Sequence, residues 1–267
     1  MIKTNGIITS RKNPTVLYAS LLCDKKLRDK TGLFAFEGIK LFEDAVSSGI
    51  VIEKVFATSK AISKWGETLL SPVCGKLFEV SDEVYAKMSF ENAPQGVFTV
   101  AKKPEKLIRE YKKDAFVMLL DSLADPGNIG TVIRSAEAFG VDSVYVGGNS
   151  ADIYGPKTVR ACMGSLFRMD VKVCDRLEND IKSLRNDGFS IYAAMLDKNS
   201  EELTKLDLSK GKIGFVIGNE GHGVSDSVRD VCSGSVIIPM REGPQSLNAA
   251  VSASVIEWEV FSKRYKA

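Results

Sequence analysis

The feature that most constrains the fold of this 267-residue chain is a regular alternation of short apolar runs and amphipathic stretches after residue 115. Phe116–Leu120 and Ile213–Ile217 are apolar runs interrupted by no polar residue. Such runs are typical of strands buried on both faces of a parallel sheet. Strands that alternate with helices predict an α/β fold with helices on both faces of that sheet. The other expected strands are 143–146, 190–195 and 235–238, and the expected helices are 129–139, 158–163, 176–187, 226–232 and 247–265.

The first hundred residues also alternate between helical and strand patterns. The expected helices are 15–27 and 40–48, and the expected strands are 33–36, 51–57, 78–80 and 95–100. A charged stretch that contains Pro104 follows and separates two apolar segments, as a linker between domains does. The sequence therefore predicts a smaller α/β domain at 1–101, a linker at 102–114 and a larger α/β domain at 115–267.

The net charge of +2 hides an asymmetry between the two predicted domains. Residues 1–114 carry 19 Lys and Arg against 14 Asp and Glu, a net charge of +5. Residues 115–267 carry 17 against 20, a net charge of −3. A basic module beside a mildly acidic one indicates that the first contacts a polyanion. Lysines that only solvate helix faces are the alternative explanation.

Composition argues against several classes of protein. No run of about 18 apolar residues occurs, so a membrane-spanning helix is not expected, and the polar N-terminus resembles no secretory signal. The five cysteines are scattered and form no CxxC pair. This argues against a zinc site and a disulfide framework, and favours the reduced thiols of a cytoplasmic protein. The single histidine, His222, argues against a histidine-based triad or metal cluster.

Ligands of open parallel sheets bind beyond the carboxyl ends of the strands, and three such ends carry unusual segments. The first, residues 119–140, reads LLDSLADPGNIGTVIRSAEAFG. Its glycines allow a tight turn, and the free N–H groups at the start of the following helix can bind an anion or a polar ligand. Asn128 and Arg134 are the candidate functional side chains. The structural alternatives are a helix cap for Asn128 and a surface ion pair with Glu137 for Arg134.

The second segment, residues 215–225, reads FVIGNEGHGVS and places Glu220 among three glycines. Its GxxGxG spacing differs from the GxGxxG of dinucleotide-binding enzymes. Glycines remove side chains where a flat ligand approaches the backbone. The third segment, residues 236–259, contains Pro239 at a strand end and Gly243-Pro244 in a loop. Ser246 is expected to cap the last helix, with Leu247 and Asn248 in its first turn.

Together, these segments resemble the three motifs of the SpoU (TrmH-type) family of S-adenosylmethionine-dependent RNA 2′-O-ribose methyltransferases. The matching positions are Asn128, Gly130 and Arg134 in the first motif, Gly218, Glu220, Gly223 and Ser225 in the second, and Ile238-Pro239-Met240, Gly243 and Ser246-Leu247-Asn248 in the third. The upstream domain resembles the family's ribosomal-protein-like RNA-binding domain at residues 10–14 and 36–38.

The resemblance implies a trefoil-knotted methyltransferase domain that works as a homodimer, binds S-adenosylmethionine and acts on RNA, by analogy ribosomal RNA. Arg134 would be the key catalytic residue, and Asn128, Glu220, Ser246 and Asn248 would orient it and the ribose. The cofactor-binding positions would be Met195, Leu196, Gly218, Ile238 and Leu247. The RNA-binding positions would be Arg11, Lys12, Lys25, Lys26 and Arg28.

Three other functions remain open from the sequence. A non-catalytic RNA-binding protein could keep the fold, although the complete set of motif residues argues against it. A knotted methyltransferase acting on transfer RNA or on a base is the second. A nucleotide-binding oxidoreductase is the third, and it lacks both GxGxxG and an acidic ribose ligand.

Overall fold

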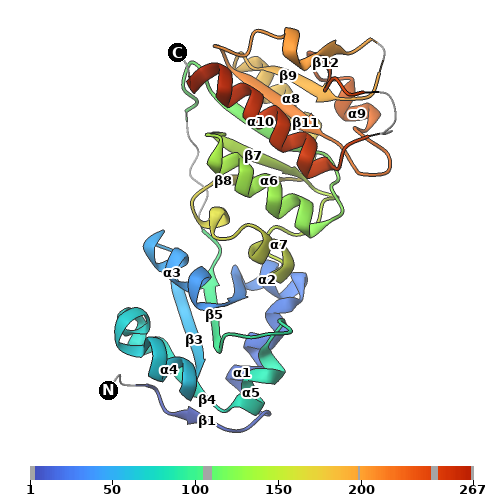
Figure 1. The fold of residues 1–267 in the computed structure, drawn as a ribbon. Helices are drawn as coiled ribbons and strands as arrows, with labels where there is room; N and C mark the ends of the chain where they lie inside the picture. Colours follow the sequence, from blue (N-terminus) through green and yellow to red (C-terminus); the bar gives the residue numbers. More distant parts are fainter. Residues whose placement is uncertain (1–3, 105–109, 198, 242–245, 266–267) are drawn as a thin grey trace. The chain divides into compact units, whose positions relative to one another are not determined.

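The computed structural model describes residues 4–104, 110–197, 199–241 and 246–265. Residues 105–109 of the expected linker and the motif residue Gly243 lie outside the described residues. The chain forms two compact units (Figure 1). The first comprises Met1–Glu105 together with Tyr154–Phe167, and the second comprises Lys106–Ile153 together with Arg168–Ala267.

The second unit contains a seven-stranded sheet in the order β10-β12-β9-β11-β6-β7-β8. Every strand pair in it is parallel, which confirms the predicted parallel α/β architecture. The strands are β6 (Phe116–Leu120), β7 (Ser143–Gly147), β8 (Asp170–Cys174), β9 (Ser190–Ala194), β10 (Glu201–Glu202), β11 (Ile213–Ile217) and β12 (Gly234–Ile237). The sequence analysis missed β8, because this edge strand carries polar residues and is only partly buried.

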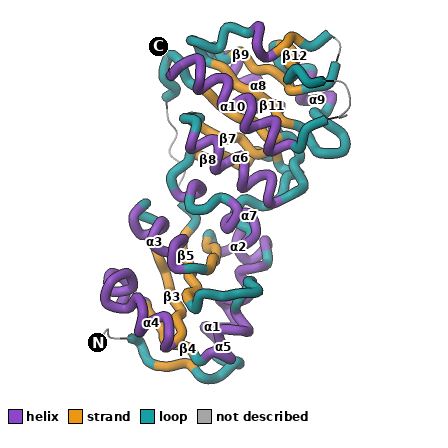
Figure 2. The backbone as a smooth tube through the Cα atoms, viewed as in Figure 1, coloured by secondary structure: helices purple, strands orange, loops and turns teal. Residues whose placement is uncertain are grey.

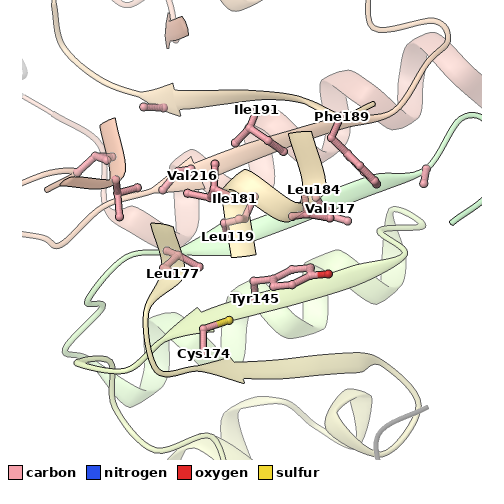
Figure 3. Packing of buried hydrophobic residues seen from close by; sticks show 14 residues of the cluster. Val117, Leu119, Tyr145, Cys174, Leu177, Ile181, Leu184, Phe189, Ile191 and Val216 are labelled. Atoms are coloured by element: carbon pink, nitrogen blue, oxygen red, sulfur yellow. The ribbon is translucent and has the colours of Figure 1, made fainter. Parts of the chain in front are cut away.

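Helices cover both faces of this sheet (Figures 1 and 2). They are α6 (Pro126–Ala138), α8 (Leu177–Asn186), α9 (Asp226–Arg229) and α10 (Ala249–Tyr265), and a 3-10 turn spans Leu203–Lys205. One face packs against α8 through Leu177, Ile181 and Leu184 (Figure 3). Helices α6 and α10 pack against each other, and α10 also contacts β11. The predicted trefoil knot stays a prediction.

The first unit contains a five-stranded mixed sheet in the order β1-β4-β3-β5-β2. The strands are β1 (Ile7–Ile8), β2 (Leu33–Glu37), β3 (Ile52–Thr58), β4 (Leu77–Val80) and β5 (Val97–Lys102). The helices are α1 (Pro14–Ser20), α2 (Lys25–Thr31), α3 (Ile39–Ser47), α4 (Ser59–Trp65), α5 (Asp82–Met88) and α7 (Pro156–Ala161). Irregular helical turns occupy Leu21–Cys23, Gly66–Leu70, Ser71–Lys76 and Ser165–Phe167.

The single helix expected at 15–27 is two helices, because Asp24 interrupts it. Asp24 has an extended backbone and its carboxylate accepts a hydrogen bond from Lys26 N, so it caps α2 instead of continuing α1. A second difference is that Tyr154 and Phe167 pack against Phe34 and Phe36 of β2. The segment that contains α7 therefore belongs to the first unit, although it lies within the chain of the second. Among the described residues, no helix is long and apolar enough to cross a membrane.

Candidate active site

A cavity of about 430 Å³ opens beyond the carboxyl ends of β9, β11 and β12 in the second unit. Its volume is in the range of pockets that bind small molecules. The five positions expected to bind a cofactor all line this cavity, as do Glu220 and Ser246. Those five are Met195, Leu196, Gly218, Ile238 and Leu247. The structure thus brings together three segments that are far apart in the sequence.

The loop after β11 forms one wall of the cavity and folds back on itself. Asn219 and Gly223 form a short antiparallel bridge, and Asn219 Oδ1 accepts hydrogen bonds from the backbone N–H groups of Gly221 and His222. Gly218 lies against the returning chain so closely that a Cβ atom there would be 2.1 Å from the carbonyl carbon of Gly223. Only glycine fits this position without moving the loop.

Two residues that the sequence analysis did not select anchor this loop to the end of β6. The buried carboxylate of Asp121 accepts a hydrogen bond from Ser225 N at 2.8 Å. The side-chain amide of Asn219 donates to the carbonyl of Ser122 at 2.8 Å. Asp121 directly follows a buried strand, and a charged residue at a strand end could have indicated from the sequence that it belongs to the site. Both contacts fix the loop that presents Glu220 and the cavity wall.

The carboxylate of Glu220 accepts three hydrogen bonds at the N-terminal end of α6. The donors are Asn128 Nδ2 at 2.8 Å, Ala124 N at 3.3 Å and Asp125 N at 3.4 Å. Partial burial acts to raise the pKa of Glu220, but these donors more than offset it and hold the pKa below its usual value. Glu220 is therefore ionised at neutral pH and serves as an acceptor that fixes Asn128.

Asn248 joins the third motif to the first. Its side-chain Nδ2 donates to Asn128 Oδ1 at 3.1 Å, while its Oδ1 accepts from Ala250 N and Val251 N. Asn248, and not Ser246, therefore provides the side-chain cap at the start of α10, and the expectation for Ser246 was wrong in this respect. Asp125 caps α6 through Asn128 N, which leaves the Asn128 side chain free to link Asn248 with Glu220.

Arg134 lies on the exposed surface of α6 and does not line the cavity. The structural alternative for Arg134, an ion pair with Glu137, is not seen in the described part of the chain, where Glu137 binds Arg168. The side chain of Arg134 makes no hydrogen bond or ion pair with any described residue. Its guanidinium group thus remains available to a ligand.

The residues present fit a cofactor that combines a flat apolar ring with polar groups. Leu196 and Met240 line the cavity and are 58% and 36% exposed, which is apolar surface that a bound ring would cover. Gly218 keeps the backbone accessible at the cavity wall, and Glu220 is the one carboxylate among the described lining residues. Within residues 4–104, 110–197, 199–241 and 246–265, no group of three or more potential metal ligands is found.

The positions expected to bind RNA lie in the first unit, and four of the five are exposed. These are Arg11, Lys12, Lys25 and Lys26. Arg28 is only 3% exposed and donates a hydrogen bond to the carbonyl of Leu22 at 2.6 Å. The expectation for Arg28 is corrected accordingly: its guanidinium group supports the chain between α1 and α2 and is not presented to a ligand.

Comparison with family models finds two matches that together cover most of the chain. The SpoU rRNA Methylase family matches residues 115–258, and the MRM3-like substrate binding domain matches residues 13–99. The 23S rRNA (guanosine(2553)-2′-O)-methyltransferase of Bacillus subtilis is 31% identical, over 95% of this chain and 98% of that protein. The 23S rRNA (uridine(2479)-2′-O)-methyltransferase of Streptomyces viridochromogenes is also 31% identical, over 96% and 92%.

Solved structures agree with these matches. An rRNA methyltransferase from Sinorhizobium meliloti superposes with a TM-score of 0.85 at 27% identity, covering 95% of this chain and 96% of that one. The SpoU methyltransferase AviRb from Streptomyces viridochromogenes, in complex with the cofactor AdoMet, superposes with a TM-score of 0.84 at 27% identity, covering 96% and 100%. The family predicted from the three sequence motifs is confirmed.

Proposed function

Because the chain belongs to the SpoU rRNA methylase family, we propose that it transfers a methyl group from S-adenosylmethionine to a ribose 2′-hydroxyl of ribosomal RNA. The observation that carries this proposal is the chain of side-chain hydrogen bonds from Asn248 through Asn128 to Glu220, beside one cavity. The two full-length relatives described above are named as 2′-O-methyltransferases of 23S rRNA, and AviRb is described with AdoMet bound.

The cavity between β9, β11, β12 and α10 is the proposed cofactor site. Met195, Leu196, Ile238 and Leu247 would supply apolar contacts, and Gly218 would let the ligand approach the backbone. S-adenosylmethionine, when bound, supplies a methyl group on a positively charged sulfur. Recognition by backbone and apolar groups agrees with a lining that contains few charged side chains.

A ribose 2′-hydroxyl is a poor nucleophile until its proton leaves or its developing charge is stabilised. A guanidinium group holds its proton too tightly to act as a general base, so we assign Arg134 to the developing alkoxide and the adjacent phosphate. Asn128, Glu220 and Asn248 would orient the ribose toward Arg134 when the RNA is bound, with Ser246 lining the cavity. Positioning of this kind can supply up to about 7–11 kcal/mol of the barrier.

The first unit is the proposed RNA-binding domain. Arg11, Lys12, Lys25 and Lys26 are exposed and would contact phosphates, which sets affinity without reading sequence. A variant that lacks residues 1–101 would not test this role cleanly. It would also lose the aromatic rings of β2 that Tyr154 and Phe167 pack against, which would disturb the remaining chain. Substitution of exposed lysines avoids this problem.

A homodimer is the proposed assembly, with α10 at its interface. Three large apolar side chains of α10 are exposed: Val251 at 48%, Trp258 at 53% and Tyr265 at 77%. Ring contacts join Trp258 to Phe139 and Phe261, so the aromatic surface is continuous. Exposed apolar patches of this kind mark protein interfaces.

The proposed location is the cytoplasm, where the five free cysteines would stay reduced.

Incubation of the purified protein with S-adenosylmethionine and ribosomal RNA from cells that lack the gene tests the proposal. Mass spectrometry of the nuclease digest should find one new 2′-O-methylated nucleoside. A methyl group on a base, or transfer to transfer RNA alone, would favour the alternative substrates. RNA binding without any transfer would favour the non-catalytic alternative.

A further inference from the structure

A second hollow, of about 470 Å³, opens within the first unit between α4, α5 and the turn that enters β5. All of its lining residues lie between Thr58 and Gly96, so it is distinct from the cavity of the second unit. Its volume suits a small ligand or one unit of a polymer. The side chains that give it chemical character are Lys60, Lys64, Trp65, Asp82 and Gln95.

One wall of the hollow combines positive charge with an aromatic ring. Lys60 and Lys64 are four residues apart on α4, so their side chains lie on the same face of the helix. Both are exposed, and neither forms an ion pair within the described part of the chain. The ammonium group of Lys64 lies 4.7 Å from the centre of the Trp65 ring, and Trp65 is half-buried. The indole therefore lies next to the Lys64 ammonium group, and the second cation, Lys60, lines the same hollow.

Hydrogen bonds and close packing fix the rim where the turn into β5 meets the start of α4. Thr58 N donates to the carbonyl of Gly96 at 3.0 Å, and a Cβ atom on Gly96 would be 2.5 Å from Thr58 Oγ1. Gln95 Oε1 accepts from Ile39 N at 3.1 Å, which orients the amide and leaves its NH₂ group as a donor with no described protein partner. A preformed rim reduces the entropy lost when a ligand binds.

At the start of α5 the edge of the hollow carries the carboxylate of Asp82 and, next to it in sequence, a paired arginine. Arg11 forms an ion pair with Glu83 at 3.4 Å, and Glu83 follows the lining residue Asp82 on α5. The turn that carries Arg11 and Lys12 therefore lies beside the start of α5. Lys60 and Lys64 are the two cations among the described lining residues, and Asp82 is the single carboxylate.

We propose that this hollow binds one unpaired nucleotide of the RNA substrate, with the base stacked against Trp65 and the neighbouring phosphates at Lys60 and Lys64. Proteins that bind single-stranded RNA combine these two elements, a basic groove for phosphates and aromatic rings for bases. Bases within a duplex are stacked on each other and cannot use such a ring. The inference rests on the proposed function, because it presumes an RNA substrate.

The first test uses the full-length protein and a fluorescent 12-nucleotide RNA without secondary structure, with the same sequence as a duplex for comparison. The double variant Lys60→Ala/Lys64→Ala should bind the single strand about tenfold more weakly. The slope of log K against log salt should fall by about 1.4, the value for two phosphate contacts on a single strand. The matched control is Lys182→Ala/Lys210→Ala, which removes two exposed lysines from the second unit and should change neither quantity.

The second test uses the fluorescence of Trp65. The single-stranded RNA should quench the tryptophan emission of the wild type, and Trp65→Phe should abolish that change, because Trp258 is the only other tryptophan. The phenylalanine keeps a ring that fills the space, so folding should be retained, and circular dichroism checks this. Trp65→Ala should weaken binding of the single strand about tenfold and binding of the duplex much less.

The inference is overturned if Lys60→Ala/Lys64→Ala binds the single strand as tightly as the control, or if quenching persists in Trp65→Phe. Methyl transfer to ribosomal RNA separates this failure from failure of the proposed function. If the wild type methylates RNA while these variants keep its KM for RNA, only the nucleotide site is wrong. If the wild type neither binds nor methylates RNA, the proposed function fails together with the inference.

Discussion

The side-chain amide of Asn248 donates a hydrogen bond to Oδ1 of Asn128 at 3.1 Å, across 120 residues of sequence. The amide nitrogen of Asn128 in turn donates to Glu220 at 2.8 Å. One residue from each sequence motif thus takes part in a single directed chain of hydrogen bonds. In both Asn128 and Asn248, the side-chain nitrogen donates a hydrogen bond and the side-chain oxygen accepts at least one. Replacing any residue of this hydrogen-bond chain therefore disturbs the orientation of the others.

Asn128→Asp should reduce kcat at least about a hundredfold. The substitution replaces the donor to Glu220 with a carboxylate, so two negative charges would meet at hydrogen-bond distance. Steady-state kinetics at saturating S-adenosylmethionine measure the effect. Asn179→Asp adds the same charge to an exposed position of α8 and should leave kcat unchanged. An Asn128→Asp enzyme with kcat within twofold of the wild type would contradict the assigned role.

Arg134→Ala should abolish methyl transfer and leave the affinity for S-adenosylmethionine nearly unchanged, because Arg134 does not line the cavity. Arg134→Lys should also lose most of the rate, since an ammonium group cannot reproduce the two-pronged contact of a guanidinium group. Calorimetry gives the cofactor affinity and radiolabel transfer gives the rate. Arg176→Ala, at an exposed position, is the control. Substantial activity in Arg134→Ala would refute the role given to this residue.

Gly218→Ala should weaken binding of S-adenosylmethionine at least about tenfold. The new methyl group would lie 2.1 Å from the carbonyl carbon of Gly223, so the loop must move. Gly234→Ala is the matched control, because its Cβ would meet only ordinary contacts at 3.5 Å from Tyr192. Equal cofactor affinities for the two variants would show that the loop geometry is not required.

Glu257→Gln should change how stability depends on pH. Glu257 is fully buried on α10, and burial raises the pKa of its carboxyl group from 4.5 to about 8. Between these values only the unfolded chain releases the proton, so the free energy of unfolding falls as pH rises. The loss approaches about 4 kcal/mol by pH 8.

Glutamine cannot ionise, so the variant and the wild type should have similar melting temperatures near pH 4.5. The variant should be the more stable of the two at pH 8. Melting curves recorded at several pH values test this, and Glu259→Gln, also on α10 but partly exposed, is the control. Parallel curves for Glu257→Gln and the wild type would exclude a buried carboxyl group that titrates on unfolding.

The sequence predicted the parallel architecture and the family because buried strands and motif spacing are local patterns. Phe116–Leu120 and Ile213–Ile217 were predicted with their observed bounds. Features that depend on tertiary contacts were harder to predict. Periodicity could not distinguish one helix at 15–27 from two helices separated by the Asp24 cap. A basic residue near other basic residues suggested an exposed Arg28, but its burial depends on how α2 packs.

Within the site, the sequence identified residues whose chemistry is evident from their type. It assigned the helix cap to Ser246 because serine often caps helices, whereas the chain folds so that Asn248 takes that position. Asp121 and Asn219 were missed because their function is to bind backbone groups of another segment. Such a role becomes visible only when the two segments are placed side by side.

Two synthetic RNAs that differ at one atom give the most direct test of methylation at the ribose 2′-oxygen. Once the methylated nucleotide is mapped, an RNA fragment is made with ribose or with 2′-deoxyribose at that position and incubated with the protein and labelled S-adenosylmethionine. We expect transfer to the ribose form and none to the deoxyribose form. Equal transfer to both would mean that the methyl group goes to a base, and would contradict the roles assigned to Arg134, Asn128, Glu220 and Asn248.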